Sequence, residues 1–285
     1  MTQRETVLVL GASGGIGGAI AAALLRHGWQ VRGMARDVMS ASHRANPHIE
    51  WVQGDALSRD DVVRAASGVA MIVHAVNPPG YRNWGKVVLP MIYNYDPAHT
   101  PVVDAGSPQE PRSRKGAIRV ALEQRLADAA PEVPSLILRA GDFFGPGVRS
   151  SWFAQAMVTP GKPVTRIVNP ASGAGHSWAY LPDLAEAFAR LMDAEDRLSP
   201  FERVHFEGIY DASGTLMTDA LRRVAGRKVP VWSFPWWLMR LAAPFGGFPR
   251  EAAEIAQYWR HPVRFDNRRL VDLIGPEPRT DLDLA

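Results

Sequence analysis

Short apolar runs alternate with longer stretches of helical spacing along the first two thirds of the chain. The runs have the length and the β-branched content of strands that are buried on both faces of a sheet. They cover residues 6–10, 30–35, 49–53, 70–76 and 135–139. Helical spacing covers residues 16–27, 59–66, 115–130 and 182–193. This alternation predicts an α/β fold, a doubly wound Rossmann parallel sheet with helices on both faces.

The pattern is less regular after the strand that ends near Val76. Only about ten residues, with Pro78, Pro79 and Gly80 among them, separate it from the apolar run Val87–Ile92, whereas a parallel crossover needs about a dozen or more. Either the crossover helix is missing, or 87–92 is not the neighbouring parallel strand. A late strand is predicted at 203–208, and the chain from about Thr215 reads as helical and Trp-rich.

The order of these elements predicts two interleaved units. A dinucleotide-binding Rossmann domain covers residues 1–145 and returns at about 176–210. A smaller, mostly helical substrate lobe covers residues 146–175 and 211–285.

Composition narrows the classes of function. The chain has no cysteine and a formal net charge of +3, which excludes disulfides and thiolate chemistry and gives no basic run for nucleic acid. No apolar stretch approaches the roughly 20 residues of a membrane span, and no targeting segment is evident. We therefore expect a cytoplasmic protein with no nucleic-acid or membrane partner. A contact of the Trp- and Phe-rich segment 229–248 with a membrane interface is the less favoured alternative to packing inside the lobe.

The first strand leads into a glycine-rich loop that opens the first helix. The loop reads Gly11-Ala12-Ser13-Gly14-Gly15-Ile16-Gly17, with glycines at 11, 14 and 17. Glycines permit a sharp turn and a close approach of backbone N–H groups to a pyrophosphate, and the helix N-terminus favours negative charge. In this strand–loop–helix context the loop predicts an NAD(P) site.

The same loop also fits a second pattern. Gly11-x-Ser13-x-Gly15 is the sequence of a hydrolase nucleophile elbow. Elbows normally follow several strands rather than the first, so a serine hydrolase using Ser13 is kept as a lesser alternative.

The end of the second strand bears on which dinucleotide is bound. An acidic residue there binds the ribose of NAD, but this strand ends Ala35-Arg36-Asp37. The Arg36 guanidinium suits the 2′-phosphate of NADP. We expect NADP, with NAD as the alternative because Asp37 is adjacent.

Several motifs occur in an order that resembles the extended and atypical short-chain dehydrogenase/reductases, the NAD-dependent epimerase/dehydratase family. Besides the glycine loop, they are Gly54-Asp55-Ala56-Leu57, Val73-His74-Ala75-Val76, the segment 138–147 with its Arg and Gly-Pro-Gly, the segment 178–185 and the segment 273–280. The resemblance implies that Asp55 and Ala56 contact the adenine and that Ala75 and Val76 lie beside the cofactor.

The chain departs from this family where the chemistry takes place. The family's catalytic Tyr-x-x-x-Lys has no counterpart, and the best-matching positions hold Lys115 and Arg119. The resemblance places Lys115 as a substitute proton donor, Arg119 on the nicotinamide ribose and Tyr93 near the substrate. The alternative is that Lys115 and Arg119 are solvated helix charges and that Tyr93 is a core or rim aromatic. The resemblance also implies a monomer or homodimer. About twenty residues appear to be missing before Tyr93, at the nicotinamide end of the cleft.

Two functions follow. The first is an NAD(P)-dependent oxidoreductase or epimerase-like enzyme for a small carbonyl or hydroxyl compound. The second is a catalytically degenerate NADP-binding sensor or regulatory protein. The eight histidines are scattered, and no metal site is expected. His176 and Asp142 are interpreted as structural.

Overall fold

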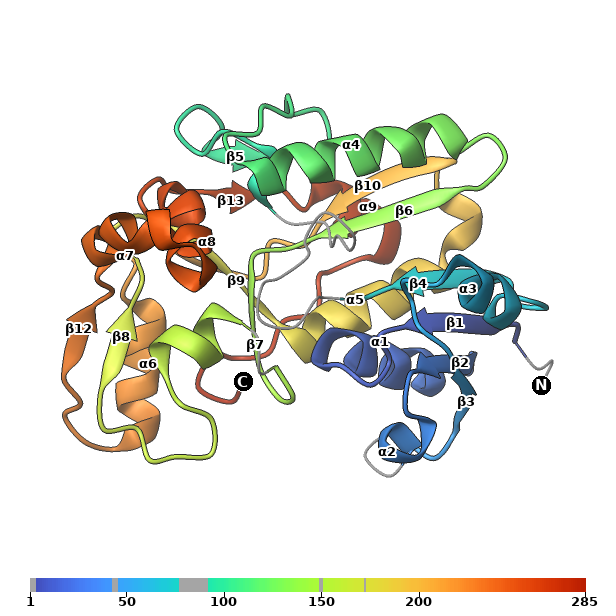
Figure 1. Cartoon of the computed structure of the whole chain (residues 1–285), viewed down its shortest axis with the longest axis horizontal. Helices are drawn as coiled ribbons and strands as arrows, with labels where there is room; N and C mark the ends of the chain where they lie inside the picture. Colours follow the sequence, from blue (N-terminus) through green and yellow to red (C-terminus); the bar gives the residue numbers. More distant parts are fainter. Residues whose placement is uncertain (1–3, 43–45, 77–91, 149–150, 172) are drawn as a thin grey trace.

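The computed structural model describes residues 4–285 apart from 43–45, 77–91, 149–150 and 172. Its first four strands form one parallel sheet in the order β3-β2-β1-β4 (Figure 1). They are β1 (Thr6–Leu10), β2 (Gln30–Ala35), β3 (Ile49–Gln53) and β4 (Met71–His74). The predicted α/β Rossmann class is confirmed, and the first three strands have the predicted bounds.

The helices of this half follow the signals in the sequence. Helix α1 (Gly15–Arg26) gives way to Gly28, whose φ is +85°, and only glycine adopts such a φ readily. Helix α3 (Arg59–Ala65) begins after Ser58, whose side chain accepts from the Asp61 amide, as N-cap residues do. The short α2 (Val38–Ser42) follows β2.

A helical layer covers the sheet. Helix α5 (Leu181–Asp193) lies against α1 and also contacts α9 (Arg268–Ile274) (Figure 1). Small buried residues of α1 and α5, among them Ala21, Ala23 and Ala187, let the two helices pack closely with Val7 and Val9 of β1.

The parallel sheet is interrupted after β4. Strand β6 (Ser135–Arg139) pairs with β10 (Phe201–His205) in a separate parallel pair. Within the described ranges, no strand pairs with the second edge of β4 or of β6. Between them the chain forms β5 (Val102–Val103) and α4 (Arg114–Ala129), which lie away from the four-stranded sheet (Figure 1). This break falls where the sequence has its short connection.

Three further strands form a separate sheet. Strand β9 (His176–Tyr180) lies between β7 (Asp142–Phe144) and β11 (Ile209–Asp211). Around them lies an aromatic core that includes Trp152, Trp178, Trp236 and Trp259.

Two predictions of secondary structure need correction, and a third falls mainly outside the described residues. The run 87–92 lies outside the described residues except for Ile92, which begins a 3-10 helix (Ile92–Asn94). The late strand is β10 at 201–205, not 203–208, because Gly208, at φ +63°, follows it in a turn. The C-terminal segment is not wholly helical. Besides α6 (Leu216–Ala225), α7 (Trp236–Ala242) and α8 (Gly247–Ile255) it contributes β12 (Val231–Ser233) beside β8 (Ile167–Asn169), and β13 (Arg264–Phe265) beside β5.

No helix in the described part of the chain is both long and apolar enough to cross a bilayer.

Candidate functional site

The glycine-rich loop is shaped by backbone contacts that exclude a Cβ atom. Gly11 has φ +89°, and a Cβ there would lie 2.7 Å from the Ala75 carbonyl oxygen. A Cβ on Gly17 would collide with the carbonyl oxygen of Gly11. The loop therefore lies tightly between the ends of β1 and β4, as a backbone cradle for phosphates requires.

The N-terminus of α1 is open to an anion. Gly14 is its N-cap, no side chain caps the helix, and its first turn has no acidic residue. Ser13 and Gly14 are exposed, and Ala12 is buried. Uncapped N–H groups together with the helix dipole favour a phosphate at this point. Gly15 and Ile16 begin α1, and Gly15 lies against Gly147 of the loop after β7. The residues present thus fit the pyrophosphate of a dinucleotide.

Arg36 lies at the carboxyl end of β2, on the same edge of the sheet as the glycine loop. Its side chain is exposed, and in the described ranges it forms no ion pair. The neighbouring Asp37 is engaged, because its Oδ1 accepts from the Ser40 amide at 3.0 Å and starts α2. The arrangement leaves Arg36, rather than Asp37, as the charged group available to a ribose phosphate.

The residues expected to contact the adenine and the cofactor beside it follow β3 and β4. Asp55 Oδ1 accepts from the Leu57 amide at 3.0 Å, and the Asp55 amide donates to Asp61 at 2.9 Å. Ala56 and Val76 pack on a small apolar cluster of Leu8, Leu10, Met34 and Ala65. Ala75 is buried and its amide donates to the Leu10 carbonyl at 3.0 Å, which extends the β1–β4 pairing to the edge of the site.

The nicotinamide side differs from the family pattern. Lys115 and Arg119 lie one turn apart on α4, and both side chains are buried. The Lys115 ammonium is 2.5 Å from Glu251 of α8, and the Lys115 amide donates to Glu254 at 2.9 Å. Lys115 is therefore held in an ion pair with a side chain about 135 residues away, which the sequence pattern does not reveal.

Arg119 and Tyr93 form part of a packed aromatic unit. The Arg119 guanidinium lies 4.8 Å from the centre of the Tyr93 ring, a cation–π distance. Burial lowers the pKa of Arg119 to about 10, against the opposing influence of Tyr93 and Tyr258, so Arg119 stays charged at neutral pH. Tyr93 is 5% exposed and meets Tyr258 edge-on at 4.9 Å. Tyr93 is thus placed as a core aromatic.

Two residues that sequence reasoning missed hold this region together. A Cβ on Gly116 would collide with the Tyr93 carbonyl oxygen, so only glycine lets α4 approach so closely. The Tyr258 hydroxyl lies 3.0 Å and 2.9 Å from the carbonyl oxygens of Tyr93 and Tyr95. Gly116 directly follows Lys115 in the segment Lys115–Arg119, whereas no sequence pattern links Tyr258 to that segment.

A buried charge network lies behind them. Arg139 of β6 is fully buried, pairs with Glu123 of α4, and donates to the Tyr95 hydroxyl at 2.6 Å. Its other partner is His205 Nε2 at 2.8 Å. Burial, assisted by the charge of Arg139, lowers the pKa of His205 to about 3, so His205 is neutral and accepts from Arg139. The Arg of the 138–147 motif therefore fixes β6 to α4 and β10.

A second buried pair lies among the aromatic side chains. His176 Nε2 is 2.8 Å from Asp142 Oδ2, and the His176 ring stacks on Trp259 at 3.8 Å. The packing agrees with the structural interpretation of both residues. In the described residues, no group of three or more His, Asp or Glu side chains could hold a metal ion.

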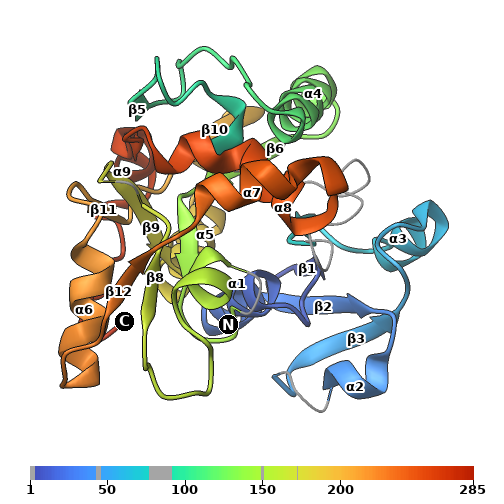
Figure 2. The ribbon, with the colours of Figure 1, turned by 60° about the vertical axis from the view of Figure 1, so that its left-hand side comes forward.

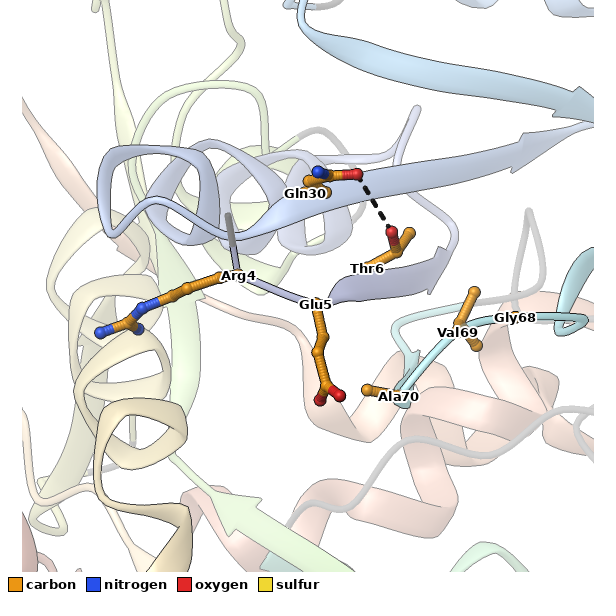
Figure 3. Close-up of a pocket in the computed structure, with 7 residues that line it drawn as sticks. All are labelled: Arg4, Glu5, Thr6, Gln30, Gly68, Val69 and Ala70. Carbon is orange, nitrogen blue, oxygen red and sulfur yellow. Dashed lines mark hydrogen bonds between the residues drawn. The ribbon is translucent and has the colours of Figure 1, made fainter. Parts of the chain in front are cut away.

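Two other places contribute nothing to the site. The hollow in Figure 3 is lined by Arg4, Glu5, Thr6, Gln30 and residues 68–70, at the amino ends of the strands, whereas ligands of open α/β sheets bind at the carboxyl ends. Among the described residues, the Ser13 hydroxyl has no hydrogen-bonded base of the kind that a hydrolase nucleophile needs.

Comparison with known proteins supports the cofactor assignment. Residues 11–95 match a family model described as NAD(P)H-binding. A search of curated proteins finds no match.

Solved structures match over nearly the whole chain. A UDP-galactose 4-epimerase superposes with a TM-score of 0.70 at 17% identity, covering 96% of this chain and 93% of that one. The UDP-glucuronic acid 4-epimerase from Bacillus cereus, in complex with UDP-glucuronic acid and NAD, gives 0.70 at 14% identity, with 98% and 95% covered. A nucleoside-diphosphate-sugar epimerase from Pseudomonas aeruginosa gives 0.68 at 16% identity, with 98% and 94% covered. The chain therefore has the fold of these sugar epimerases, and its residues 11–95 resemble an NAD(P)H-binding domain.

Proposed function

We propose that this protein binds NADP(H) in preference to NAD(H) and holds it without the tyrosine-based proton transfer of the epimerase fold. The observation that carries the preference is the exposed Arg36 at the end of β2, beside an Asp37 that caps α2. A guanidinium at this place pairs with a 2′-phosphate, whereas the carboxylate that would bind two ribose hydroxyls is engaged.

The rest of the cofactor would be held by residues at the same edge of the sheet. The loop 11–17 and the N-terminus of α1 would take the pyrophosphate, Asp55 and Ala56 the adenine, and Ala75 and Val76 the face beside β4. The bound dinucleotide supplies a hydride donor or acceptor.

The second part of the proposal rests on Lys115. The position of the family's tyrosine holds an ammonium that is 4% exposed and paired with Glu251. A proton donor must reach the substrate, whereas the Lys115 ammonium is buried and directed at Glu251. This geometry favours a dinucleotide sensor or regulatory protein.

An oxidoreductase or epimerase-like enzyme for a small carbonyl or hydroxyl compound remains the second candidate. It is favoured by the placement of Lys115 and Arg119 on one helix face, one turn apart, as the family's catalytic pair is spaced. In that case Lys115 would give its proton to the carbonyl oxygen of the substrate, and a proton from solvent would return to Lys115 through Glu251.

Arg36→Ala tests the cofactor preference. Removing charge-assisted bonds worth about 1.5–3 kcal/mol each should weaken NADPH binding about tenfold to a hundredfold and leave NADH binding unchanged. The measurement is a titration followed by nicotinamide fluorescence. Arg125→Ala, which removes an exposed arginine from α4, is the matched control and should bind as the wild type does. Equal losses for NADPH and NADH would contradict the assignment of Arg36.

A further inference from the structure

Helix α7, the 3-10 turn Ala243–Phe245 and the start of α8 present an apolar surface to solvent. Trp237 is 69% exposed, Leu241 68% and Phe245 92%, and Leu238 and Phe248 are also exposed. These five side chains make up the α7–α8 face. Helices α7 and α8 contact each other and lie side by side (Figure 2), so the five residues belong to one part of the surface.

The helices that carry this face are firmly anchored. Trp236 is buried, and its indole N–H donates to the Pro170 carbonyl at 2.8 Å. Ala252 and Ile255 of α8 are buried in the aromatic core. The face is thus displayed by packed helices, and soluble proteins rarely leave a surface so rich in Trp, Leu and Phe uncovered unless it binds something.

The charged residues of segment 229–250 have one sign. They are Arg240 and Arg250, and both are exposed. The next acidic residues along the chain, Glu251 and Glu254 of α8, contact Lys115 on α4. Segment 229–250 therefore combines large apolar side chains with arginines and contains no carboxylate.

We propose that the α7–α8 face docks on an anionic phospholipid bilayer, lying in the interface without crossing it. Trp, Leu and Phe side chains insert at the headgroup level, and arginines pair with anionic headgroups. A second copy of the chain is a poorer occupant, because a two-fold contact would bring the arginines of the two faces together. This inference replaces the expectation from sequence that segment 229–248 packs inside the lobe, since only part of that segment is buried.

Co-sedimentation with vesicles tests the proposal. The full chain is mixed with vesicles of phosphatidylcholine alone or of phosphatidylcholine with phosphatidylglycerol. We expect binding to the anionic vesicles only, and binding that weakens as salt is added. The triple variant Trp237→Ser, Leu241→Ser, Phe245→Ser should lose at least tenfold in partitioning. Arg240→Gln should lose on the order of fivefold, from about 1 kcal/mol per basic residue near the surface.

Two controls make the result specific. The double variant Met39→Ser, Val224→Ser removes exposed apolar side chains elsewhere and should bind vesicles as the wild type does. Thermal unfolding of the triple variant should match the wild type, since exposed positions are changed. The proposal is overturned if the triple variant binds as tightly as the wild type, or if anionic lipid makes no difference. It is also overturned if the wild type binds no vesicles and sediments as a dimer that the triple variant dissociates, because the face is then a contact between two copies.

Discussion

The half of the molecule around β1–β4 and the half around β6, β10 and α4 differ in the polarity of their interiors. The first is a continuous parallel sheet with an apolar interior made of residues such as Val7, Val9, Leu24 and Val31. The second is a separate pair of strands whose interior holds Arg139, Glu123, His205 and Asn94. The interruption of the sheet lies between them.

This difference indicates which part of the fold tolerates substitutions. The end proposed to bind adenine and pyrophosphate needs the tight backbone contacts of Gly11 and Gly17, and both contacts are present. In the second half, hydrogen bonds between residues far apart in the sequence take the place of a continuous sheet. Examples are the bond from Arg139 to the Tyr95 hydroxyl and the bond from the Tyr258 hydroxyl to the Tyr93 carbonyl. Cofactor binding and fold stability should therefore respond to different substitutions.

The largest effect is expected from Glu123→Ala. This change leaves the fully buried Arg139 without its carboxylate, and breaking a buried pair on one side costs about 3–5 kcal/mol. Urea unfolding followed by circular dichroism should show this loss in the free energy of unfolding. Glu132→Ala, at an exposed position, should change it little. A Glu123→Ala protein of normal stability would mean that the second half does not depend on its buried charges.

The next effect concerns the glycine loop. A methyl group at Gly17 meets the Gly11 carbonyl, and overpacking of this kind costs about 1–3 kcal/mol. Gly17→Ala should therefore weaken NADPH binding roughly tenfold to a hundredfold, as measured by fluorescence titration. Gly106→Ala is the control, because a Cβ there makes ordinary contact only. Unchanged NADPH affinity in Gly17→Ala would place the phosphates elsewhere.

A smaller effect is expected from pH. The pKa of His205 is lowered to about 3 by burial, and then by Arg139, whereas in the unfolded chain it is about 6.5. The unfolded state takes up this proton first, so the His205 contribution is fully present above pH 6.5. It is lost as the pH falls toward 3, by about 1.4 kcal/mol per pH unit.

The check is the difference between two pH profiles of unfolding. His205→Gln keeps an acceptor for Arg139 but does not titrate, so its stability should fall less steeply with acid than that of the wild type. Parallel profiles would contradict this account, because they would show that His205 titrates alike in the folded and unfolded protein.

The sequence predicted the first half well because its signals are local. The strands at 6–10, 30–35 and 49–53 are set by short apolar runs, and the glycine spacing fixes the loop between β1 and α1. The irregular pattern after Val76 is also a local signal, and it left open whether the next apolar run is a neighbouring parallel strand.

The second half could be predicted only in outline. Helix α4 and strand β6 are found where expected, but the partners of their charged residues lie far along the chain. Lys115 meets Glu251, and Arg139 meets His205. The spacing of Lys115 and Arg119 placed them one turn apart on α4, while the ion pair of Lys115 depends on the placement of α8, which no local signal encodes.

The central claim is that the intact half binds NADP(H) although the other half has lost the usual catalytic tyrosine. The most direct measurement is titration of the purified protein with NADPH and with NADH, following nicotinamide fluorescence and thermal shift together. The account predicts tight binding of NADPH, weaker binding of NADH and a rise in the unfolding temperature with NADPH. Binding of neither dinucleotide would contradict it and would leave the glycine loop without its proposed ligand.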